Sequence, residues 1–312
     1  MRTELCDLLG IEYPIIQGAM AHITDGKFAA TVSNTGALGV IQSGFDYPDI
    51  VREQIRIAKA NTDKPFAVNL IMESEVVEEN AQVVIDEKVP IVPISAGNPA
   101  KIVPPLVEAG VKVLCLVPHG RAAKKMQDLG ATAIIAEGME SGGHIGSMTT
   151  LPMVRQIVEA VDIPVIAAGG IADGNGLLAM LALGAVGVQM GTAFLVANEC
   201  PVAQEYKDLV VAAQDDATIL TGEPGGKQVR CIKNRFTRGY WRLYNSGASS
   251  AALDAFCTGS IGRAKNGDVV NGAASAGMIA SIIKECKPAQ QIVDDIMAEA
   301  DAAYAKLKEL YG

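Results

Sequence analysis

The sequence predicts an α/β protein in which eight parallel strands and their helices form a (β/α)8 TIM barrel. Short apolar runs alternate with amphipathic stretches along the first two-thirds of the 312-residue chain, at a repeat of roughly 20–25 residues. The residues are 49% hydrophobic but only 4% aromatic, which is typical of parallel strands built from Ala, Val, Ile and Leu under a helical cover. A doubly wound open sheet would also alternate, but eight consecutive units favour closure.

The predicted strands are the apolar runs themselves, at 14–17, 37–41, 66–70, 90–94, 111–117, 132–136, 164–168 and 186–190. Helical stretches lie between them, including 47–61, 75–87, 99–109, 119–129, 150–161 and 174–183. Several of these stop at a glycine, such as Gly110, Gly130 and Gly184, the residue that most often follows a helix C-terminus.

The alternation stops after the eighth strand. Residues 198–268 are polar, helical in character and lack an apolar run of the kind that forms a buried strand. They predict a small helical cap domain over the barrel mouth, and residues 221–226 indicate a flexible joint within it. The barrel domain would then comprise residues 1–197 plus 269–312, with core-like composition again at 270–281 and a final helix at 290–310.

Composition excludes several classes of protein. The net charge of −9 argues against general nucleic-acid binding. The six cysteines are scattered without a CxxC pair, which favours reduced thiols over disulfides or a metal site. The N-terminus is not a signal peptide, and no uncharged apolar stretch is long enough to span a membrane. We therefore expect a cytoplasmic protein with no metal site and no membrane or nucleic-acid partner.

The turns after the last two predicted strands indicate a phosphate site. Gly169 and Gly170 follow the seventh strand, and Gly191 and Thr192 follow the eighth. Barrel enzymes commonly bind phosphate there through backbone N–H groups. Tight turns without a ligand are the alternative. There is no Walker loop and no dinucleotide-binding GxGxxG, and acids are few at the strand ends, so FMN is the natural candidate cofactor.

The loop after the sixth predicted strand carries chemistry of its own. Residues 136–146 read AEGMESGGHIG, with two carboxylates and one of the three histidines of the chain. Glycine backbone lets a flat ligand approach closely, and the imidazole of His144 can transfer a proton near neutral pH. The alternative is a glycine-rich turn with an incidental surface histidine.

These segments together resemble the flavin-dependent enoyl-acyl-carrier-protein reductases of type II, which share a superfamily with the nitronate monooxygenases (2-nitropropane dioxygenases). The resemblance spans essentially the whole chain and rests on the sequence segments 14–18, 32–34, 64–66, 96–99, 136–146, 163–174, 189–192 and 267–272. Glu137 is typical of the reductase branch, since many nitronate monooxygenases carry Gln at that position.

The resemblance implies roles for individual residues. His144 would lie beside the isoalloxazine as the catalytic residue, and Ser275 would approach the flavin. The residues that would bind the cofactor are Gln17, Gly18, Ala19, Met20, Asn69, Glu137, Gly142, Gly143, Ala168, Gly169, Gly170, Gln189, Met190, Gly191, Thr192, Gly277 and Met278. His22 stands where the family usually has a large aromatic residue, and Ala193 where an arginine is common.

A basic segment, residues 227–242, contains six Lys and Arg residues and no acid. Three interpretations are open. The segment could be a docking surface for the acidic acyl carrier protein, it could bind the pyrophosphate of a nicotinamide dinucleotide, or its side chains could form ion pairs with acidic residues of the protein itself or of a neighbouring subunit. Tyr240 and Trp241 would cover a substrate channel or anchor the cap. His22 would reach the pocket, whereas His119 is expected to be a turn residue.

The sequence therefore predicts an FMN-dependent enoyl-thioester reductase that uses NADH or NADPH. A nitronate monooxygenase is the nearest alternative, and a flavin-binding protein without turnover is a third. The resemblance also implies a homodimer.

Overall fold

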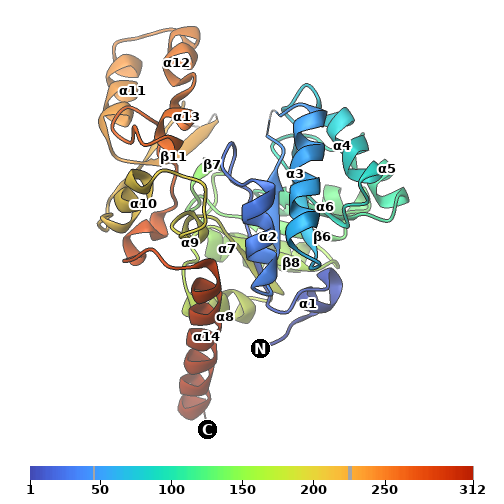
Figure 1. Ribbon diagram of the computed structural model, residues 1–312. Coiled ribbons are helices and arrows are strands. Elements are labelled where there is room, and N and C mark those ends of the chain that lie inside the picture. Colours follow the sequence, from blue (N-terminus) through green and yellow to red (C-terminus); the bar gives the residue numbers. More distant parts are fainter. Residues whose placement is uncertain (45, 224–226, 312) are drawn as a thin grey trace.

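Eight parallel strands form a barrel in the computed structural model, which describes residues 1–44, 46–223 and 227–311 (Figure 1). Their order around the barrel is β1-β9-β8-β6-β5-β4-β3-β2. The ring closes between β2 and β1 where Ile16 bridges Leu38 in parallel, so the barrel prediction is confirmed and the open sheet is excluded. The barrel strands are β1 (Ile15–Gln17), β2 (Gly39–Gln42), β3 (Phe66–Ile71), β4 (Ile91–Ser95), β5 (Lys112–Val117), β6 (Ala133–Glu137), β8 (Val165–Ala168) and β9 (Gly187–Met190).

Helices cover the outside of the barrel, and the main hydrophobic core lies between them and the strands. They are α2 (Gly26–Asn34), α3 (Pro48–Asn61), α4 (Val77–Asp86), α5 (Val103–Glu108), α6 (Gly120–Asp128), α7 (Thr150–Ala160) and α8 (Gly174–Ala182).

A second core fills the barrel interior and is covered at one end by a short helix, α1 (Glu4–Leu9). Leu5 of this helix lies against Gly187, the first residue of β9, since a Cβ there would meet the Leu5 side chain. Helix α1 therefore covers the amino ends of the strands, and the opposite, carboxyl ends remain for function.

The segment after β9 is not purely helical, so that part of the cap prediction is wrong. It contains α9 (Thr192–Leu195), α10 (Gln204–Val211), β10 (Thr218–Thr221), β11 (Gln228–Ile232), α11 (Arg235–Asn245), α12 (Ser250–Cys257) and α13 (Ser260–Lys265). Strands β10 and β11 form an antiparallel sheet with β7 (Gly143–Ile145), which lies in the predicted glycine loop. These strands are mostly half-buried, so no buried apolar run marked them. Residues 224–226 of the predicted joint lie outside the described residues.

The chain then returns to the barrel through the 3-10 helix η1 (Met278–Ile282) and ends in α14 (Ala289–Tyr311). Ala274, Ala276 and Ala280 are buried, as the core-like composition predicted. Helix α14 packs along α8, and its last turns project beyond the barrel (Figure 1). No helix among the described residues is both long and apolar enough to cross a membrane. The division into a barrel and a separate cap domain stays a prediction.

Candidate active site at the carboxyl ends of the strands

The glycine turns after β8 and β9 leave backbone donors free. Gly169 and Gly170 have φ of 87° and 75°, a left-handed conformation that favours glycine. The amides of Gly169, Gly170 and Gly191 donate to no acceptor among the described residues. A Cβ on Gly191 would meet nothing within 4 Å. Unpaired N–H groups on neighbouring strand ends, with open space beside Gly191, fit a phosphate group.

Three segments that are distant in the sequence meet at these turns. Thr192 Oγ1 accepts a hydrogen bond from the Gly277 amide at 2.9 Å, and the Met278 amide donates to the Glu140 carbonyl at 2.9 Å. Ser141 adds a buried hydroxyl beside the carboxyl of Glu137, where its hydrogen bond lowers the pKa of that carboxyl against the larger effect of burial. The free amides of the glycine turns therefore remain the feature that indicates where a polar ligand would bind.

The two carboxylates of the glycine loop have different surroundings. Glu137 ends β6, and burial raises the pKa of its carboxyl from 4.5 to about 7. Glu140 instead accepts hydrogen bonds from the Thr150 amide and hydroxyl, both at 2.9 Å, and so caps α7. Glu137 is therefore the carboxylate available for chemistry, whereas Glu140 has a structural role.

His144 lies in β7 and its position is fixed by the small antiparallel sheet. Its backbone pairs with Val229 of β11, and Gly143 pairs with Arg230. The imidazole is exposed, so it is accessible to a ligand at the barrel mouth. The catalytic role of His144 stays a prediction, and the sequence did not predict the strand that carries it.

Gln17 and Asn69 shape the rim of the barrel. Gln17 is 0% exposed and its Oε1 accepts from the Val40 amide at 3.0 Å. Asn69 Nδ2 donates to the Pro93 carbonyl at 3.2 Å. Gly18 lies against the side chain of Gln189, and Ala19 and Met20 are half-buried beside it. Gln17 thus supports this rim from inside the barrel. The cofactor contacts expected of the rim residues stay predictions.

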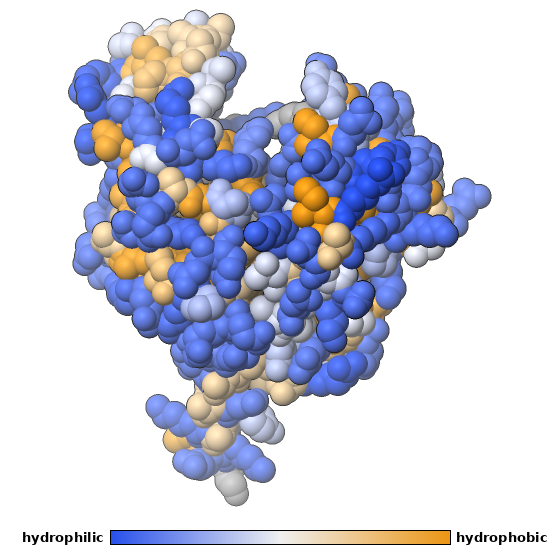
Figure 2. Space-filling view, viewed as in Figure 1, coloured by the Kyte–Doolittle hydropathy of each residue, from blue (hydrophilic) through white to orange (hydrophobic). Residues whose placement is uncertain are grey.

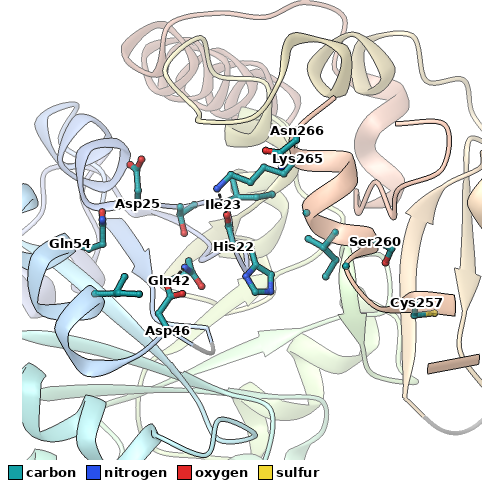
Figure 3. Close-up of a pocket in the computed structure, with 15 residues that line it drawn as sticks. His22, Ile23, Asp25, Gln42, Asp46, Gln54, Cys257, Ser260, Lys265 and Asn266 are labelled. Atoms are coloured by element: carbon teal, nitrogen blue, oxygen red, sulfur yellow. Dashed lines mark hydrogen bonds between the residues drawn. The ribbon is translucent and has the colours of Figure 1, made fainter. Parts of the chain in front are cut away.

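A cavity of about 540 Å³ lies between the barrel and the segment that follows β9 (Figure 3). His22 lines it in a left-handed conformation, with φ of 63°. Lys265 Nζ reaches across to donate to the His22 carbonyl at 2.5 Å. Figure 2 shows a notch in the surface between the α11–α12 lobe and the barrel. His22 follows Met20, one of the rim residues, by two positions in the chain. The other residues that line the cavity are Ile23, Thr24, Asp25, Gln42, Asp46, Ile50, Gln54, Cys257, Gly259, Ser260, Ile261, Gly262 and Asn266.

The other histidine and the aromatic pair have structural roles. His119 Nδ1 accepts from the Ala122 amide at 3.1 Å and caps α6, as expected of a turn residue. Trp241 donates to the Leu220 carbonyl at 2.8 Å and packs edge-on against Tyr240 and Tyr244. These contacts favour the anchoring interpretation of Tyr240 and Trp241.

The basic segment separates into two groups. Lys227 pairs with Glu73 at 2.6 Å and Lys233 with Asp216 at 2.8 Å, so these two lysines do pair with the protein's own acids. Arg230 is 5% exposed and turns inward to the Met139 carbonyl, a contact that sequence reasoning missed because nothing in the local pattern marks it. The second group, on α11, consists of Arg235, Arg238 and Arg242, which line a separate cavity.

Comparison with known proteins places this arrangement in a family. The nitronate monooxygenase family model matches residues 2–84 and 73–299. A probable nitronate monooxygenase from Staphylococcus saprophyticus is 34% identical over 283 residues, which cover 76% of this chain and 80% of that protein.

Two solved structures extend the comparison. FabK from Thermotoga maritima matches with a TM-score of 0.96 and 41% identity, covering 99% of both chains. A nitroalkane oxidase from Streptomyces ansochromogenes matches with a TM-score of 0.86 and 28% identity, covering 97% of this chain and 99% of the other.

Proposed function

The chain belongs to the nitronate monooxygenase family of flavin-dependent oxidoreductases, and on this premise we propose that it is an FMN-dependent reductase of trans-2-enoyl thioesters. The observation that carries the proposal is the match to FabK, which extends over 99% of both chains at 41% identity. The match to the nitroalkane oxidase is weaker, at 28% identity. Glu137 at the end of β6 supports the same branch of the family.

The free amides of Gly169, Gly170 and Gly191, together with Thr192, would hold the FMN phosphate. The half-buried Ala19 and Met20 and the backbone of Gly277 and Met278 would flank the flavin ring. The chemistry that bound FMN supplies is hydride transfer from a reduced nicotinamide to the β-carbon of the enoyl thioester.

His144 would complete the reduction by placing a proton at the α-carbon. Its imidazole is exposed, and its backbone is fixed by pairing with Val229. General acid catalysis requires a donor that is held at the reacting atom and titrates near neutral pH. Burial raises the pKa of the Glu137 carboxyl to about 7. Below that pH the carboxyl would be largely neutral, so it would not add a negative charge beside a bound flavin that already carries a charged phosphate.

The cavity between barrel and cap would receive the acyl thioester. Its volume of about 540 Å³ lies within the usual range of ligand pockets, roughly 300–1,000 Å³. Its polar rim, with Asp25, Asp46 and Lys265, suits a thioester carrier more than a small nitroalkane. The carrier would be acyl carrier protein or coenzyme A, and the reductant NADH or NADPH.

A nitronate monooxygenase is the second candidate function, because the family model and the staphylococcal relative carry that name. Steady-state assays separate the two. Consumption of NADH or NADPH that depends on crotonyl-coenzyme A, with no oxygen uptake, supports the reductase. Oxygen uptake that depends on an alkyl nitronate, with no use of nicotinamide, would make the chain a monooxygenase.

The resemblance to the family also bears on how the protein assembles and where it is located. A homodimer is proposed, and the exposed Tyr304, Leu307 and Leu310 near the end of α14 offer apolar surface for a second copy. Light scattering tests this directly, and a monomer mass would refute it. A cytoplasmic location is also proposed, on the scattered and unpaired cysteines.

A further inference from the structure

A second cavity, of about 360 Å³, has four arginines and no acid among its lining residues. Three of the arginines come from α11 and the fourth, Arg263, from α13. The complete lining is Arg235, Phe236, Arg238, Gly239, Arg242, Phe256, Arg263 and Asn271. We call this the arginine cavity.

The charge of the arginine cavity is only partly balanced by a neighbouring carboxylate. Asp268 accepts hydrogen bonds from the Asn271 amide and side chain at 3.0–3.1 Å, and the charge of Arg263 further lowers the pKa of its carboxyl. Among the ion pairs of the described residues, none includes Arg235, Arg238 or Arg242. All four arginines are exposed, so solvent and salt screen part of their mutual repulsion, but they gather four like charges around one space in a protein of net charge −9. A ligand with several negative charges would relieve that repulsion.

One arginine is already held in place for such a ligand. Arg263 donates from Nη1 to the Thr258 carbonyl at 3.1 Å and from Nε to the Asn271 carbonyl at 3.4 Å. Its Nη2 makes no hydrogen bond among the described residues. Guanidinium groups bind the oxygens of phosphates and carboxylates through two parallel N–H groups, so the cavity favours an oxyanion over a halide, and four arginines favour an anion that carries several charges, such as a phosphorylated group.

Apart from Asn271, the remaining lining consists of two aromatic rings and a glycine. The ring of Phe256 stacks on Phe236 with centroids 5.2 Å apart and an angle of 11° between the planes. Gly239 makes this possible, because a Cβ there would come within 2.9 Å of Phe256 Cζ. An aromatic surface beside arginines fits a purine base attached to phosphates.

Only a short stretch of chain separates the arginine cavity from the candidate active site. Val229, which pairs with His144, lies six residues before Arg235. Six residues of extended chain span at most about 20 Å. The pantetheine arm of coenzyme A and the extended dinucleotide of NADPH can both cover such a distance.

We propose that the arginine cavity binds the phosphorylated adenosine diphosphate portion of a substrate or reductant. Two molecules carry that group: NADPH with its 2′-phosphate and coenzyme A thioesters with their 3′-phosphate. NADH and the phosphopantetheine of acyl carrier protein lack it. The inference rests on the proposed function for the identity of these molecules, but binding of the group itself does not require turnover.

The test is calorimetric titration of the flavin-loaded protein at low salt with adenosine 2′,5′-bisphosphate and with adenosine 3′,5′-bisphosphate. We expect one of them to bind, with affinity that falls as salt is added. Arg238→Ala should weaken binding about tenfold or more, because one charge-assisted contact to phosphate is lost. Arg238→Lys should weaken it less. Arg121→Ala, which removes an exposed arginine from α6, is the matched control and should bind as the unmodified protein does.

Kinetics then identify the source of the group. If the reductant occupies the cavity, Arg238→Ala raises KM for NADPH and leaves KM for NADH unchanged. If the thioester does, the variant raises KM for crotonyl-coenzyme A and leaves that for crotonyl-pantetheine unchanged.

Two outcomes would overturn the inference: neither bisphosphate binds, or the one that binds does so as tightly to Arg238→Ala as to the unmodified protein. Loss of activity in Arg238→Ala with acyl carrier protein substrates alone, without bisphosphate binding, would assign the arginines to a protein partner instead. Bisphosphate binding in a protein that reduces no enoyl thioester would support the cavity and refute the proposed reaction.

Discussion

The guanidinium of Arg230 donates two hydrogen bonds to the carbonyl of Met139, from Nε at 3.1 Å and from Nη2 at 2.9 Å. A third, from Nη1, reaches Thr218 Oγ1 at 3.1 Å. Burial lowers the pKa of Arg230, but a guanidinium stays charged at any ordinary pH. Arg230 therefore joins the β10–β11 hairpin to the loop that carries Glu137 and His144.

Replacing Arg230 should loosen that loop. Arg230→Ala leaves a carbonyl without its charged donor, which costs about 2–3 kcal/mol, so thermal unfolding should begin several degrees lower. Arg230→Ala should also retain less flavin on dialysis, because the loosened loop belongs to the candidate cofactor site. The neighbouring variant Lys233→Ala removes an exposed ion pair with Asp216 and should change neither, since exposed pairs contribute little. Equal behaviour of the two variants would show that the Arg230–Met139 contact does not hold the loop.

Glu137 should make stability depend on pH. Because burial raises its pKa from 4.5 to about 7, the folded protein keeps a proton in that window that the unfolded chain has released. Folding stability from this group is therefore greatest at the acid end and falls as pH rises through the window. Glu137→Gln should raise the Tm by a few degrees at pH 8 but not at pH 4.5. A Tm difference that is the same at both pH values would refute the raised pKa.

The fold was largely predictable because barrel strands are buried on both faces. Runs such as Phe66–Ile71 and Lys112–Val117 are nearly continuous apolar sequence bounded by polar helices, and this pattern has few other interpretations. The hairpin of Thr218–Thr221 and Gln228–Ile232 was missed for the opposite reason. Its strands are mostly half-buried and contain polar residues, so they resemble loop or helix sequence.

The geometry of the candidate site was predictable only where the backbone requires a particular residue. Gly169 and Gly170 indicated a tight turn at a strand end, because positive φ favours glycine and parallel strands bring their carboxyl ends together; their role in binding a cofactor stays a prediction. The Arg230–Met139 contact joins residues 91 positions apart, and no local pattern encodes such a pairing. The full burial of Gln17 likewise depends on neighbouring strands.

Gly169 should be intolerant of a side chain. Gly169→Ala would place a Cβ 2.8 Å from the Gly138 carbonyl oxygen, in addition to about 1–2 kcal/mol of left-handed strain. Gly110 is a matched control, since its φ is 79° and a Cβ there meets nothing within 4 Å. We expect both variants to be destabilised, but only Gly169→Ala to lose flavin absorbance after gel filtration. Full flavin retention in Gly169→Ala would exclude this turn from cofactor binding.

His144 should affect turnover rather than folding. Its side chain is exposed and makes no hydrogen bond among the described residues, so His144→Ala should leave Tm unchanged. Loss of a positioned acid should lower kcat with crotonyl-coenzyme A by roughly 10²–10⁴-fold, while reduction of the flavin by nicotinamide stays within a few-fold. His144→Gln should be as slow, because it cannot titrate. A variant with unchanged kcat would remove His144 from the mechanism.

Anaerobic stopped-flow absorbance at the flavin band tests the central claim most directly. The flavin-loaded protein is mixed first with NADH or NADPH and then with crotonyl-coenzyme A. The proposed function predicts bleaching by a nicotinamide within the time of one turnover, followed by recovery of the band when the enoyl thioester is added. If neither nicotinamide bleaches the flavin, and an alkyl nitronate is oxidised once oxygen is admitted, the chain is a nitronate monooxygenase and the proposed reduction is wrong.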